Sequence, residues 1–90
     1  MLKPDLARAI AEQTGLSLDR ANEVITAATD QISAAAARGE DVTLVGFGSF
    51  HVRTRQARNG RNPRTGALLR IEAGRTVAFR PGKALREAVQ

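Results

Sequence analysis

The sequence predicts an α+β protein whose elements follow the order α-α-β-β-β-α. In the first forty residues, apolar side chains recur at helical spacing, whereas from Val42 onward they alternate with polar ones, as they do in strands. A third observation concerns the segment Arg53–Arg64, which holds five arginines and, besides Ala57 and Pro63, no apolar side chain. Such a segment has little to bury, so it predicts a ribbon that extends away from the core.

The first predicted helix covers residues 3–14. Leu6 and Ile10 lie one helical turn apart, Pro4 suits a first turn, and Gly15 suits a C-terminal cap. The second predicted helix follows after a very short connection, so the two helices should pack as a hairpin.

Ser17 is the expected N-cap of this second helix. Ile25, Ile32 and their neighbours at intervals of three or four form its apolar face, and Gly39 stops it. The helical hairpin therefore occupies residues 1–41.

Three strands and a short helix are predicted for the remaining residues. The strands cover 42–45, 49–56 and about 68–79, and Gly46 and Gly48 mark a tight turn between the first two. We expect one domain over residues 1–90, with the sheet at 42–80, the arm at about 53–76 and the C-terminal helix at 81–90.

The stretch GRNPRTG, Gly60–Gly66, joins the second and third strands. Pro63 cannot donate to a sheet ladder, and the two glycines bracket a tight turn, so this stretch predicts the tip of a two-stranded arm. An isolated ribbon is marginally stable in water. We therefore expect the arm to be mobile when free and ordered against negative charge.

Without the arm, about 65 residues remain, and a domain of that size is marginally stable alone. Its helices are rich in alanine, while Phe47, Phe50 and Phe79 gather at the base of the predicted sheet. A second copy of the chain would complete this core, so we expect an obligate, intertwined homodimer with two arms. The alternative is a compact monomer with the ribbon folded over its helices, but that would bury unpaired arginines.

Charge is divided unequally along the chain. Residues 1–41 hold four basic and seven acidic residues, whereas residues 42–90 hold ten basic and two acidic ones, for a net charge of +5. This asymmetry predicts a polyanionic partner, although an arginine-rich surface without a partner is the simpler alternative. Arginine, with its planar fork of donors, matches phosphate oxygens and groove edges.

Composition also excludes several classes of function. With no cysteine and one histidine, disulfides and transition-metal sites are not expected, and no apolar run is long enough to cross a membrane. We expect a cytoplasmic protein without a cofactor or a small-molecule ligand. His51, Glu72 and Glu87 form no nucleophile–base pair, so an enzyme is not expected. The absence of Trp and Tyr favours duplex DNA over single strands as the partner.

The motifs GFGSF at 46–50, GRNPRTG at 60–66 and FRPGKALREAV at 79–89 resemble the HU/IHF family of bacterial histone-like DNA-binding proteins across all 90 residues. The resemblance implies a homodimer whose arms enter the minor groove of duplex DNA. It also implies that Pro63 intercalates and kinks the duplex, a mechanism for which HU and IHF are themselves known examples. The function implied is largely nonspecific architectural bending and compaction of the nucleoid.

The resemblance further implies DNA contacts from the arm, the sheet and the helices. The residues concerned are Lys3, Arg53, Arg55, Arg58, Arg61, Asn62, Pro63, Arg64, Thr65, Arg70, Arg75, Arg80 and Lys83. One position departs from the pattern, because many members carry a basic residue where this chain has Ala67. We expect this to remove a phosphate contact from the returning strand, with compensation from Arg64 and Arg70.

Two other functions stay open at this point. The chain could be one subunit of a site-specific, IHF-like DNA-bending heterodimer, paired with a paralogue. It could also be an RNA-binding protein with a basic hairpin, although the lack of exposed aromatic residues argues against this.

Overall fold

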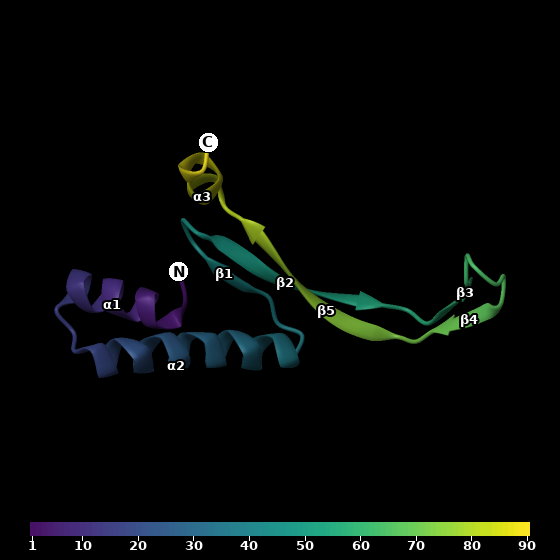
Figure 1. Cartoon of the computed structure of the whole chain (residues 1–90), viewed down its shortest axis with the longest axis horizontal. Helices are drawn as coiled ribbons and strands as arrows, with labels where there is room; N and C mark the ends of the chain where they lie inside the picture. The colour runs from purple at the N-terminus through teal and green to yellow at the C-terminus, as the bar shows by residue number, and fades with distance from the viewer. The chain divides into compact units, whose positions relative to one another are not determined.

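The computed structural model describes all residues, 1–90, and confirms the predicted α+β class. The chain divides into two compact units, Met1–Ala35 and Ala36–Gln90. Figure 1 shows the elements in chain order. They are α1 (Lys3–Thr14), α2 (Leu18–Ala37), β1 (Val42–Leu44), β2 (Gly48–Arg55), β3 (Arg58–Arg61), β4 (Leu68–Ile71), β5 (Gly74–Pro81) and α3 (Lys83–Ala88).

The two long helices begin and end close to the predicted positions. At the start of α1, the backbone N–H of Leu2 donates to the Asp5 carboxylate at 2.8 Å. Gly15 ends this helix with φ 76°, a left-handed conformation that glycine adopts at little cost. Ser17 caps α2, because its Oγ accepts the backbone N–H of Arg20 at 3.1 Å.

Small residues form the interior of the first unit. Ala7 and Ala21 are completely buried, Ile25 is nearly so, and Ile10 and Ala11 pack against them. Alanine lets two helices approach closely but buries little apolar area. The helical hairpin therefore has a thin core of its own.

The second unit is built on an antiparallel sheet with the strand order β1-β2-β5. Gly46 turns the chain between β1 and β2 with φ 85°, as predicted. Gly48, expected to belong to the same turn, is instead the first residue of β2 and is buried. A Cβ built there would lie 2.6 Å from the Phe79 ring, so only glycine fits beside that ring.

The prediction of one continuous third strand over residues 68–79 is wrong. This segment forms two strands, β4 and β5, and β3 pairs with β4 in a separate two-stranded sheet. The register nevertheless continues across the gap, because Arg55 pairs with Gly74 and Arg58 pairs with Ile71. The ladder is therefore interrupted without a shift in pairing, and at the gap the Arg55 side chain donates to the Glu72 carbonyl at 3.1 Å.

Candidate nucleic-acid interface

The arm consists of β3, β4 and the turn between them, and it lies at the end of the ribbon that is distant from α3 within the second unit (Figure 1). Backbone hydrogen bonds close the turn, from the Gly66 N–H to the Asn62 carbonyl and from the Asn62 N–H to the Ala67 carbonyl, both at 2.8 Å. Gly66 has φ 70°, which explains the second glycine of GRNPRTG. The predicted tip is therefore a defined turn.

Side chains stiffen this turn as well. The Asn62 carboxamide oxygen accepts the Arg64 backbone N–H at 2.8 Å, and the Thr65 hydroxyl accepts the Ala67 N–H at 3.2 Å. Asn62 and Thr65 thus hold the turn from inside, while Pro63 is exposed at its apex. A rigid apolar ring without an N–H, presented on such a turn, has the shape and chemistry of a wedge.

The arginines between residues 53 and 80, in the sheet, the arm and its turn, fall into two groups. In the first group, the guanidinium has no hydrogen-bond or ion-pair partner within the chain, as for Arg53, Arg58, Arg64 and Arg80. In the second group it is engaged: Arg55 donates to the Glu72 carbonyl, Arg61 to the Gly66 carbonyl, Arg70 to the Glu72 carboxylate and Arg75 to the Ala37 carbonyl. All eight residues are exposed, so the surface is strongly basic and partly unneutralised.

Position in the ladder separates Arg75 from the other sheet arginines. Ser49 pairs with Arg80, and Arg53 lies four residues along the same strand, so these side chains share one face of the sheet. Arg75 pairs with Thr54 and lies on the opposite face, where its guanidinium donates to the Ala37 carbonyl at 3.1 Å. Arg75 therefore satisfies an open carbonyl at the end of α2.

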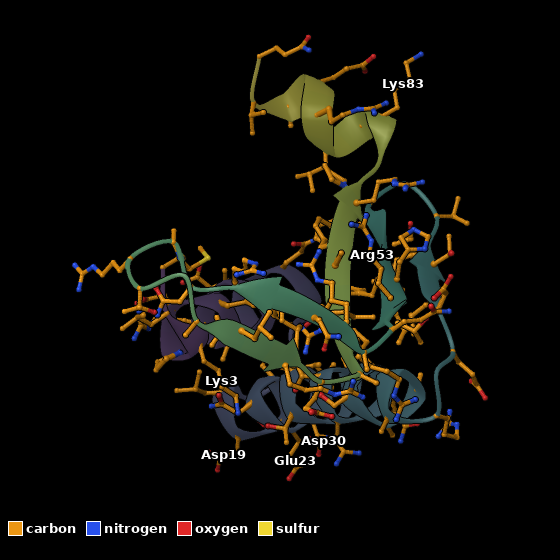
Figure 2. All side chains as sticks on the ribbon, turned by 90° about the vertical axis from the view of Figure 1, so that its right-hand side faces the viewer. Lys3, Asp19, Glu23, Asp30, Arg53 and Lys83 are labelled. Atoms are coloured by element: carbon orange, nitrogen blue, oxygen red, sulfur yellow. The ribbon has the colours of Figure 1, made fainter.

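The two predicted lysine contacts lie on helices. Lys3 donates from Nζ to the Thr26 hydroxyl at 2.7 Å, so it is held in place by a neutral partner. Lys83 lies on α3, where its ammonium is 3.8 Å from the Glu87 carboxylate (Figure 2). Both side chains are exposed.

Acidic side chains gather on α2. Asp19, Glu23 and Asp30 are spaced so that they share one side of the helix, and Figure 2 shows them pointing the same way. These acidic side chains lie on a helix, whereas the arginines between residues 53 and 80 lie on the sheet and the arm. The unequal charge of the two halves of the sequence is therefore also a difference between helix and strands.

The three phenylalanines come together as predicted. The Phe79 ring lies 5.4 Å from that of Phe47 and 4.9 Å from that of Phe50, between ring centroids. Yet Phe47 remains 46% exposed and Phe79 41% exposed, and no large side chain anywhere in the chain is fully buried. A single chain therefore leaves its main apolar cluster open on one side.

One group of polar side chains was not predicted from the sequence, where His51 was considered only as a catalytic base and rejected. Its Nε2 lies 2.9 Å from the Ser49 hydroxyl, and its Nδ1 lies 3.1 Å from the Asp41 carboxylate. The other Asp41 oxygen accepts the Val52 N–H at 3.0 Å, and this bond, then the bond to His51, lowers the pKa of the Asp41 carboxyl. The available signal was the alternation that places residues 49 and 51 on one strand face.

Other kinds of site find no support in the residues. No group of three or more His, Cys, Asp or Glu side chains is placed to hold a metal ion. No helix combines the length and apolar character that a membrane span requires.

Comparison with known proteins agrees with this geometry. A family model described as bacterial DNA-binding protein matches residues 1–90. The chain is 55% identical to DNA-binding protein HU-alpha of Pseudomonas aeruginosa over 89 residues, 99% of both chains, and 48% identical to DNA-binding protein HU of Geobacillus stearothermophilus over 90 residues, the whole of both.

Two solved structures are also similar. One is the cocrystal structure of Anabaena HU with DNA, with a TM-score of 0.86 and 47% identity over 99% of this chain and 97% of that one. The other is a variant of HU from Thermotoga maritima, with a TM-score of 0.74 and 30% identity over the whole of both chains. The chain therefore belongs to the HU/IHF family of bacterial DNA-binding proteins.

Proposed function

We propose that this chain is an architectural protein that binds and bends duplex DNA with little sequence preference, and so helps to compact the bacterial nucleoid in the cytoplasm. The arm is the observation that carries the proposal. It presents exposed arginines on both strands and an exposed Pro63 at the apex of a stiff turn. The family and the HU–DNA cocrystal of a relative support the same partner.

The arm suits the minor groove of DNA. A narrow minor groove has an enhanced negative potential that attracts inserted guanidinium groups. Arg58 and Arg64 have no partner in the chain and are free to enter it, while Arg61 is held against the Gly66 carbonyl beside the turn. Pro63 would then meet the base pairs edge-on and wedge between two of them, which is the known mechanism of HU and IHF.

The working unit in this proposal is a homodimer. The open phenylalanine cluster of one chain, Phe47, Phe50 and Phe79, would meet the same cluster in a second copy across a two-fold axis. Association would supply the large buried side chains that a single chain lacks. Such a homodimer would have two arms, and it would therefore kink the DNA at two points in each bound site.

Basic residues outside the arm would contact the DNA backbone and not the bases. Arg53 and Arg80, which share a sheet face, would meet the DNA backbone between the arms. Lys3 and Lys83 would meet flanking phosphates. Arg75 is bonded on the other sheet face and is assigned to holding α2 rather than to DNA.

The test compares two labelled duplexes of equal length, one intact and one nicked at its centre, across a salt series. A protein that bends DNA should bind the nicked duplex more tightly, because the nick removes much of the bending cost. Its affinity should fall steeply with salt and change little between unrelated sequences. Equal, weak binding to both duplexes would contradict the proposal, and preference for duplex RNA in competition would replace it.

A further inference from the structure

A hydrogen-bond network of three polar side chains connects the start of β1 to the polar face of β2. It runs from the Asp41 carboxylate through the His51 ring to the Ser49 hydroxyl, with contacts of 3.1 and 2.9 Å. The Val52 N–H holds Asp41 in place, because it donates to the second Asp41 oxygen at 3.0 Å. His51 is the only histidine of the protein, and its side chain is 28% exposed.

This network has two charge states with the same heavy-atom positions. A carboxylate only accepts, so the hydrogen on the ring lies on Nδ1 and points at Asp41. In the neutral ring, Nε2 accepts the Ser49 O–H. When the ring takes up a proton, Nε2 donates to Ser49 Oγ instead, and the Ser49 hydrogen turns outward. Protonation thus adds to this face both a positive charge and a free O–H donor.

Charged side chains surround the ring on this face. On β2, Arg53 lies two residues further along the same face; on β5, Ala78 lies opposite His51, and Arg80 lies opposite Ser49. From the β1 side, the Asp41 carboxylate faces Nδ1 of the ring. A phosphate bound on this face would lie beside the two arginines and the ring and would attract any positive charge there.

We propose that His51 is a proton-linked phosphate contact on the sheet face, so that DNA binding takes up a proton there and the affinity for DNA rises as the pH falls. The inference rests on the proposed function, because it assigns a further binding residue to the same surface. By linkage, a phosphate that favours the charged ring must itself bind more tightly when the ring is charged. The ring acts through its charge, because both ring nitrogens are engaged within the chain. The Ser49 O–H is the group that can donate to the phosphate, and Asp41 positions the ring as a fixed acceptor.

The experiment measures the affinity of the full chain for one labelled intact duplex by fluorescence anisotropy, at constant ionic strength, between about pH 5.5 and pH 7.5, where histidine changes charge. The matched control is His51→Gln, whose amide keeps polar contacts but does not titrate. We expect the wild type to bind roughly two- to fivefold more tightly per protomer at the acidic end, as for a surface charge contact. The control should show no such gain.

A second readout separates a binding role from a structural one. Calorimetric titration in two buffers of different ionisation enthalpy measures the protons taken up on binding. The wild type should take up protons near neutral pH and His51→Gln should not.

The outcomes are distinct. If both proteins bind DNA with the same pH profile, or if no protons are taken up by the wild type, the inference is overturned while the proposed function stands. If the wild type binds no duplex at any pH, the proposed function itself fails.

Discussion

Glu72 is the only acidic residue between Arg53 and Thr76, and its neutralisation should strengthen DNA binding. Its carboxylate accepts the Arg70 guanidinium at 3.2 Å, and both side chains are largely exposed. In Glu72→Gln, Arg70 loses its ionic partner and becomes available to a phosphate. The Glu72 backbone carbonyl, which accepts Arg55, is unchanged, so the interruption in the ladder should persist.

The size of the effect can be bounded. Removal of a competing exposed ion pair alone is worth about 0.2–1 kcal/mol, or roughly 1.4- to fivefold in affinity per arm. One additional phosphate contact steepens the slope of log affinity against log salt by about 0.9, so that affinity falls about eightfold further over a tenfold rise in salt. For a dimer with two arms, we therefore expect a slope steeper by up to about 1.8.

Fluorescence anisotropy across a salt series measures both quantities. Glu12→Gln, on α1, is the matched control, because it changes the net charge by the same amount away from the arm. If the two variants gain equally, net charge rather than Arg70 explains the effect. Unchanged or weaker binding by Glu72→Gln would refute the assignment of Arg70 to the DNA surface.

Three further variants test other parts of the structure. Gly48→Ala should destabilise the protein by about 1–3 kcal/mol in urea unfolding, because its Cβ would lie 2.6 Å from the Phe79 ring, whereas Gly60→Ala, with its nearest contact at 3.4 Å, should change little. Pro63→Ala should reduce the bend angle measured by energy transfer while affinity changes less than about tenfold, since phosphate contacts dominate affinity; an unchanged bend would exclude the wedge. The pKa of Asp41 is lowered in the folded chain, so its contribution to stability is present above its unfolded pKa of about 4 and is lost as the pH falls through the lower folded value. Asp41→Asn should therefore flatten the acid limb of stability against pH, and an unchanged limb would show that these hydrogen bonds contribute nothing.

Much of the fold could be predicted because its signals are local. Ser17 caps α2 through a hydroxyl three residues from the N–H that it accepts, and Gly15 and Gly46 take positive φ within their own turns. The tip GRNPRTG is equally local, since every bond that closes it joins residues within five positions. Short-range geometry of this kind depends on residue type and order alone.

The rest depended on which strands pair and in what register. Pairing of β2 with β5 brings Gly48 against Phe79, and that contact, not a turn, explains the glycine. The same pairing assigns Arg75 to the face opposite Arg80, which the charge of the segment could not reveal. At the interruption between β2 and β3, the Arg55 side chain donates to the Glu72 carbonyl of the opposite strand, a contact between residues 17 positions apart.

Asp41 and His51 show the difference most clearly. Ten residues separate them in the sequence, and each looks like an ordinary surface charge there. The sequence by itself determined the helices, the charge division and the arginine-rich arm, because these follow from composition and from contacts within a turn or two. Only the tertiary structure decided which polar groups meet across strands, because a one-residue change of register moves every side chain to the other face of the sheet.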